Sequence, residues 1–67
     1  MKTDAEIEEL LKNTERLAFL IRHGCAPNVD FHGNYFIIVT NKKNVECVID
    51  DFDANRCIDK AMEYAKT

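Results

Sequence analysis

The chain has 67 residues, of which 46% are hydrophobic and 31% charged, and its net charge is −3. This length predicts a single small domain over residues 1–67, with little room for a substrate pocket. The acidic balance argues against non-specific nucleic-acid binding, which needs a dense basic surface. No apolar run approaches the roughly 20 residues of a membrane span, and the acidic start does not resemble a secretory signal. We therefore expect a cytoplasmic protein that does not enter a membrane.

The first segment, from about Asp4 to His23, has the pattern of an amphipathic helix. Thr3 with Glu6 forms a capping box, and Gly24 follows where a left-handed C-cap is favoured. A mostly apolar stripe recurs with helical spacing, and we expect it to face the core. It consists of Ile7, Leu10, Leu11, Thr14, Leu17, Ala18 and Ile21.

Phe19 does not belong to this stripe, because at about 100° per residue it falls on the polar face of the helix. Two interpretations are open for it. It is either a single exposed aromatic side chain, which is ordinary, or a contact with a partner chain.

The segment from residue 29 to residue 50 has the pattern of three antiparallel strands joined by two turns. The Gly-Asn pair at 33–34 predicts a two-residue turn that pairs His32 with Tyr35. The NKKN sequence predicts a four-residue turn that pairs Thr40 with Val45. In these registers seven side chains share one face, which we expect to meet the helices. They are Val29, Phe31, Phe36, Ile38, Val45, Cys47 and Ile49.

The last segment predicts a second helix, with Asp53 as its N-cap and Asp51 as a competing cap. Its buried stripe is small, and Met62 and Tyr64 stand at its borders. The stripe consists of Ala54, Cys57, Ile58, Ala61 and Ala65. The whole pattern predicts an α+β fold in two layers, α-β-β-β-α, in which a three-stranded antiparallel meander packs against two helices.

The middle strand raises a question, because it is apolar at every position from Tyr35 to Val39. Either one helix lies on each face of the sheet, or one apolar face stays open. An open apolar strip with a charged margin has the character of a docking surface. We therefore predict a partner interface, formed with another protein or with a second copy of the chain. Its residues are Tyr35, Ile37, Val39, Val48 and Phe19.

No metal, cofactor or catalytic site is expected. His23, Cys25 and His32 bracket one loop, but their spacing matches no common zinc pattern. The segment 51–55 begins like an EF-hand loop and then fails, because Arg56 stands where glycine is required. The odd number of cysteines and the lack of a CxxC motif predict reduced thiols.

Only Cys25 is expected to be accessible among the cysteines, since the other two fall on predicted core faces. Without a substrate pocket to serve it, this thiol does not indicate an enzyme.

Two resemblances bear on function. The α-β-β-β-α order is shared with double-stranded RNA-binding domains, which grip phosphates with a lysine-rich start of the second helix. Here that position reads DDFDANR, which would repel phosphate. The alternative of a nucleic-acid-associated regulator would therefore need Arg22, Lys42 and Lys43 to gather on one side.

The second half of the chain, a hairpin NYFIIVTNKKNVECVID followed by an acid-capped helix FDANRCIDKAMEYAK, resembles small phage or prophage accessory proteins. This resemblance implies a protein that binds a host protein and inhibits or redirects it. Together with the open strip, it favours a protein-interaction module over a nucleic-acid-associated regulator.

Overall fold

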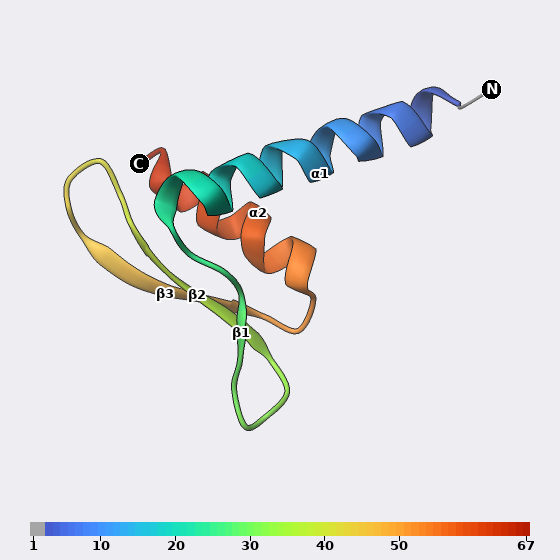
Figure 1. Cartoon of the computed structure of the whole chain (residues 1–67). Coiled ribbons are helices and arrows are strands. Elements are labelled where there is room, and N and C mark those ends of the chain that lie inside the picture. Colours follow the sequence, from blue (N-terminus) through green and yellow to red (C-terminus); the bar gives the residue numbers. More distant parts are fainter. Residues whose placement is uncertain (1–2) are drawn as a thin grey trace.

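The computed structural model describes residues 3–67 and contains two helices and one three-stranded sheet (Figure 1). All neighbouring strands are antiparallel and follow the order β1-β2-β3. The predicted α+β fold and its element order are therefore confirmed. The elements are α1 (Asp4–His23), β1 (Asn28–Val29), β2 (Tyr35–Thr40), β3 (Glu46–Asp51) and α2 (Ala54–Ala65).

Both ends of α1 and the start of α2 are fixed by the caps that the sequence predicts. The Thr3 hydroxyl accepts a hydrogen bond from the backbone N–H of Glu6 at 3.2 Å. Gly24 ends α1 with a left-handed φ of 61°, which glycine adopts without steric cost. At the start of α2, the Asp53 carboxylate accepts from the backbone N–H of Arg56 at 3.0 Å.

The two helices do not cover the sheet equally. α2 lies along one face of β2 and β3, and α1 crosses over α2 with its C-terminal half (Figure 1). The N-terminal half of α1 projects beyond the rest of the molecule. The predicted stripe of α2 is confirmed as its buried face, since Cys57 and Ala61 are fully buried. Its small side chains let the helix approach the sheet closely.

Both hairpins use the same three-residue loop, which differs from either predicted turn. Asp30 in the first loop and Asn41 in the second accept hydrogen bonds from the backbone N–H groups two and four residues ahead, all at 2.9 Å. The last loop residue is left-handed in each, with φ of 85° at Gly33 and 63° at Asn44. This is a type I turn closed by a bulge, and it is one residue longer than the predicted first turn and one residue shorter than the predicted second turn.

The shorter second loop shifts the register of β2 against β3 by one residue and reverses the predicted faces of β2. Thr40 pairs with Glu46 rather than with Val45. A shift of one residue moves every side chain of a strand to the opposite face. Ile37 and Val39, predicted on the open face, are 0% and 3% exposed beneath α2, whereas Ile38, predicted in the core, is 50% exposed.

The first hairpin is displaced further than the second. Val29 pairs with Tyr35, so Phe31 lies in the turn instead of in a strand. Its side chain is 92% exposed, and the prediction that it faces the helices is wrong.

The predicted inward face of α1 is also wrong. Phe19 is 9% exposed in the core cluster with Ile37, Val39 and α2, whereas Ile21 of the apolar stripe is 72% exposed. Arg16, on the same side as Phe19, is 8% exposed. The helix therefore packs through its polar face and turns its aliphatic stripe outward.

An ion pair between the helices accounts for this orientation. The Nε and Nη2 atoms of Arg16 donate to the two carboxylate oxygens of Asp59 at 2.8 and 2.9 Å. Its Nη1 donates to Asn13 Oδ1 at 2.8 Å. Two parallel hydrogen bonds to one carboxylate are the strongest geometry that arginine offers. The pair lowers the pKa of Asp59 below its usual value, through the hydrogen bond first.

A second acidic group is held beneath the start of α2. Lys60 Nζ lies 2.7 Å from Asp51 Oδ2, and the backbone N–H of Asp53 donates to Asp51 Oδ1 at 3.0 Å. The hydrogen bonds from Lys60 and from the Asp53 backbone lower the pKa of Asp51. Asp51 therefore ends β3 as a charged anchor for α2, and Asp53 alone serves as the N-cap.

The reversed strand faces predict a contrast between adjacent residues. Ile37→Ala removes a fully buried side chain and is expected to lower the free energy of unfolding by about 2–5 kcal/mol. Ile38→Ala shortens a side chain on the outer face of the sheet and should lower the free energy of unfolding by less than about 1 kcal/mol. Urea denaturation of both variants measures the difference. Equal losses would show that the register is not the one described.

The Arg16–Asp59 pair predicts acid sensitivity. Because folding lowers the pKa of Asp59, the pair stabilises the fold above the unfolded carboxyl value of about 3.9 and loses this contribution as the pH falls through the lower folded value. Asp59→Asn should therefore lower the free energy of unfolding by about 1–2 kcal/mol at pH 7. This loss is smaller than for a fully buried ion pair, because the Asp59 side chain is half exposed.

Urea denaturation at neutral and strongly acidic pH measures this effect. Asp59→Asn should lose less stability on acidification than the unaltered chain. Asp50→Asn, on the outer sheet face and without an ion pair among residues 3–67, is the control. A control with the same reduced acid sensitivity would contradict the assignment to the Arg16 pair.

Candidate interaction surfaces

The five residues of the predicted interface do not form one open surface. Ile37, Val39 and Phe19 belong to the buried core, and Tyr35 packs partly buried against it. Val48 alone remains on the outer face of the sheet, with 59% of its surface exposed. One sheet face is open, but the apolar strip predicted for it is covered by α2, and Val48 is the single predicted residue that lies on the open face.

The outer sheet face carries a small apolar group. Ile38 and Val48 lie directly opposite each other on β2 and β3, and both are at least half exposed. Phe36, next on this face of β2, is partly buried. Glu46 and Asp50 border the group on β3. Three apolar side chains with a charged margin make a modest contact area.

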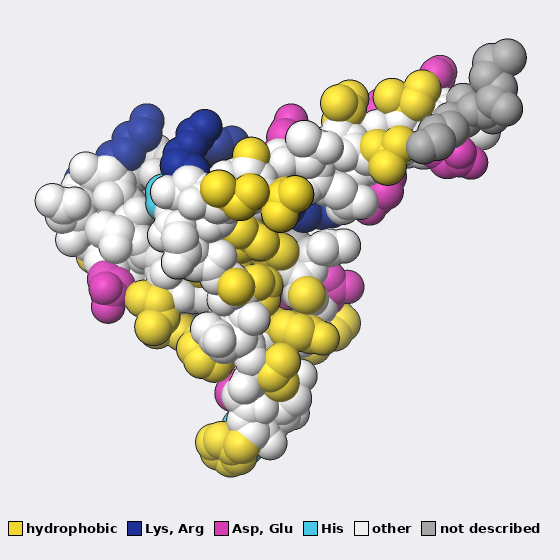
Figure 2. All heavy atoms as spheres, in the orientation of Figure 1, with side chains coloured by type: hydrophobic (Ala, Val, Ile, Leu, Met, Phe, Trp, Pro, Cys, Tyr) yellow, Lys and Arg dark blue, Asp and Glu magenta, His cyan; other side chains and the backbone are white. Residues whose placement is uncertain are grey.

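The larger apolar surface lies on α1, on the side that faces away from α2. We call it the α1 outer face; its residues are Ile7, Leu10, Leu11, Thr14, Leu17, Ala18 and Ile21. Its five large aliphatic side chains are between 45% and 72% exposed. They run along roughly 20 Å of helix, at 1.5 Å per residue. Figure 2 shows hydrophobic side chains along the projecting part of α1.

The one polar member of the α1 outer face is already satisfied. The Thr14 hydroxyl donates to the backbone carbonyl of Leu10 at 2.9 Å. A hydroxyl bonded within its own helix can be buried against another chain without losing a partner. A second chain can therefore cover the entire α1 outer face without leaving the Thr14 hydroxyl unbonded.

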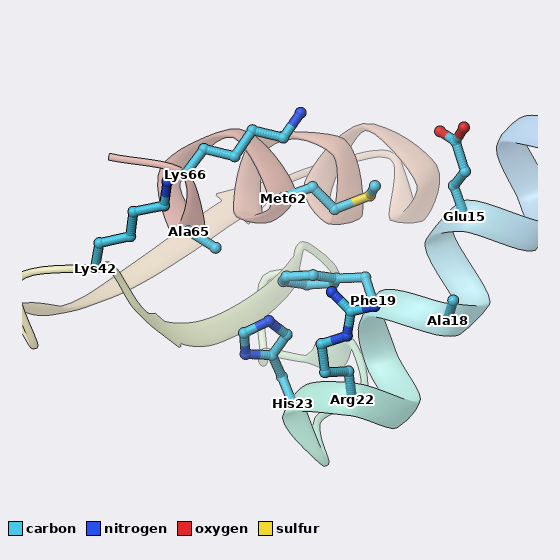
Figure 3. Close-up of a pocket in the computed structure, with 9 residues that line it drawn as sticks. All are labelled: Glu15, Ala18, Phe19, Arg22, His23, Lys42, Met62, Ala65 and Lys66. Carbon is cyan, nitrogen blue, oxygen red and sulfur yellow. The ribbon is translucent and has the colours of Figure 1, made fainter.

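A groove of about 390 Å³ opens beside the C-terminal half of α1 (Figure 3). Its apolar lining includes Phe19 and Met62. Arg22 comes from α1, Lys42 from the β2–β3 loop and Lys66 from the end of α2. The hydroxyl of Tyr64 on α2 donates to the carbonyl of Val45 at 3.0 Å, which ties this loop to the helix.

The groove brings together two of the three basic residues that the nucleic-acid hypothesis requires. Arg22 and Lys42 both line it, but Lys43 does not. Lys66 joins them, and no sequence pattern indicated it because it lies far from both along the chain. Figure 2 shows lysine and arginine side chains gathered at this end of the molecule, and acidic side chains along the N-terminal half of α1.

One thiol, that of Cys25, occupies a less open position than the sequence suggests. All three cysteines are free. Cys25, expected to be accessible, is partly buried against the core, and burial raises its pKa. Cys57 is fully buried, and its Sγ lies 3.4 Å from the Ile49 carbonyl oxygen. Neither environment promotes the reactive thiolate form.

Residues 3–67 contain neither a metal-binding cluster nor a membrane-spanning helix. No group of three histidine, cysteine or acidic side chains in this range lies close enough to hold a metal ion. Neither helix in this range is long and apolar enough to cross a membrane.

Comparisons with models of protein families, with curated proteins and with solved structures found no match to this chain.

Proposed function

We propose that the chain is a small protein-interaction module that associates with a second copy of itself through the α1 outer face. The observation that carries this proposal is the orientation of α1. The helix buries Arg16 and Phe19 against the rest of the chain and leaves five large aliphatic side chains in solvent. An exposed apolar row of this length is typical of an interface rather than of the ordinary surface of a monomer.

The apolar area is sufficient for reversible association. Fully burying a large aliphatic side chain contributes roughly 1.5–3 kcal/mol, and these side chains are already about half buried. Ten of them in a symmetric pair therefore contribute on the order of 7–15 kcal/mol, against an association cost of about 4–15 kcal/mol. The expected complex is one that forms and separates with concentration.

The outer sheet face is the alternative place for a contact. It lies on the far side of the sheet from α2, so a protein bound there would not compete with a partner on α1. The resemblance to phage accessory proteins supports a host protein as that partner. A cytoplasmic setting belongs to the same proposal, because its reducing conditions suit three free cysteines.

Self-association predicts a mass that rises with concentration toward twice 7.7 kDa in a light-scattering series. Leu17→Glu places a charge near the centre of the α1 outer face and should leave a folded monomer at all concentrations, because an unpaired charge is costly to bury. Val48→Glu is the matched control on the outer sheet face and should leave association intact.

Two results would contradict the proposal. A monomer at every concentration would exclude self-association. Association that survives Leu17→Glu but not Val48→Glu would move the contact to the outer sheet face. Circular dichroism of each variant confirms that a change in mass does not arise from unfolding.

A nucleic-acid-associated regulator is the second candidate, because Arg22, Lys42 and Lys66 surround one groove. It predicts binding of a nucleic acid that weakens steeply with salt, since phosphate contacts release counterions. A gel-shift titration at low salt with duplex RNA and with single-stranded DNA tests it. Lys42→Glu should weaken any specific shift, and the absence of a shift at low salt would exclude this function.

A further inference from the structure

We infer that two copies pair through α1 in antiparallel orientation, about a two-fold axis that passes Thr14. This inference rests on the proposed self-association and adds its geometry. The α1 outer face is symmetric about Thr14. Ile7 and Ile21 are equally distant from Thr14 along the helix, as are Leu11 and Leu17. In an antiparallel pair, Ile7 therefore lies opposite the partner's Ile21, and Leu11 opposite the partner's Leu17.

The remaining positions fit the same arrangement. Leu10 lies opposite the partner's Ala18, so that a large side chain meets a small one. Thr14 meets the partner's Thr14 on the axis, where its hydroxyl is already bonded to the Leu10 carbonyl. Every position of the stripe is thus matched to another position of the stripe.

Charge distinguishes the antiparallel from the parallel arrangement. The first turn of α1 is acidic, and its last turn contains Arg22 and His23. A parallel pair would place acidic turns side by side, and also basic ones. An antiparallel pair sets each acidic start against a basic end and also opposes the two helix dipoles favourably.

One side of the stripe shows this complementarity residue by residue. Helical spacing places Asp4, Glu8, Glu15 and Arg22 in one row along α1. In the antiparallel pair this row borders the same row of the partner, and Arg22 falls between the partner's Asp4 and the partner's Glu8. Arg22 forms no ion pair with any of residues 3–67, so it is available for this contact.

The groove lies on the same side of α1, because Glu15 and Arg22 line it. Lys42 and Lys66 therefore add to the positive charge of Arg22 on the side of α1 that the acidic first turn of the partner's α1 approaches. Glu15 is the exception in this row, since it lies one residue from the axis and meets the partner's Glu15. The arrangement predicts that Glu15→Gln strengthens pairing.

Charge reversal with sedimentation equilibrium at low salt tests this orientation. Arg22→Glu should raise the dissociation constant about tenfold, because both symmetric copies of the contact change from attractive to repulsive. Glu8→Arg should weaken pairing in the same way. The double variant Arg22→Glu/Glu8→Arg should pair more tightly than either single variant, because the introduced glutamate then faces the partner's introduced arginine.

The outcomes separate this inference from the function on which it rests. A parallel pair would set the last turn of α1 against the partner's last turn, far from the partner's Asp4 and the partner's Glu8, so Arg22→Glu alone would not raise the dissociation constant. That result, or a double variant no tighter than the single ones, overturns the orientation while Leu17→Glu still abolishes pairing. If Leu17→Glu leaves the mass unchanged, the α1 outer face itself is excluded. Both charged sites are exposed, so loss of folding is not expected and is checked by circular dichroism.

Discussion

The ion pair between Arg16 and Asp59 determines which face of α1 turns inward. Nε and Nη2 of the guanidinium are bonded to Asp59 and Nη1 to Asn13, and the side chain has little other exposure. Phe19, one turn further along the helix, is then directed into the core between α2 and the sheet. Rotating α1 to bury its aliphatic stripe would separate this pair and leave Phe19 in solvent. The outward position of the stripe follows from that contact.

The sheet depends in the same way on two short loops. Asp30 and Asn41 each bind two backbone N–H groups of the loop that follows, and this fixes where the next strand begins. Once the register is set, the helix-facing residues of β2 are Ile37 and Val39 rather than their neighbours. A side-chain hydrogen bond in a turn therefore decides the composition of the core, because strand faces alternate residue by residue.

The helix caps, which local chemistry sets, could be predicted from the sequence, whereas the inward face of α1, which a contact between distant segments sets, could not. The caps at Thr3, Gly24 and Asp53 depend on residues within one turn, and all three were predicted. The inward face of α1 depends on Asp59, which is 43 positions away from Arg16. The apolar pattern of α1 suggested the opposite face, because it does not distinguish a stripe that faces the core from one that faces another chain. Only Phe19, which is isolated on the polar side of the helix, indicated that this side could be the buried one.

The misassigned face of α1 has a physical cause that bears on function. A partly buried ion pair such as Arg16–Asp59 contributes little to stability relative to apolar packing, but it specifies orientation, because a misplaced arginine is costly to bury. A monomer that needed only stability would bury the five aliphatic side chains of α1 and expose Arg16. This chain does the reverse and keeps a row of leucine and isoleucine in solvent. Such an arrangement is favourable when a second surface covers the row, and the acidic start and basic end of α1 give a second copy of the same helix the required charge pattern.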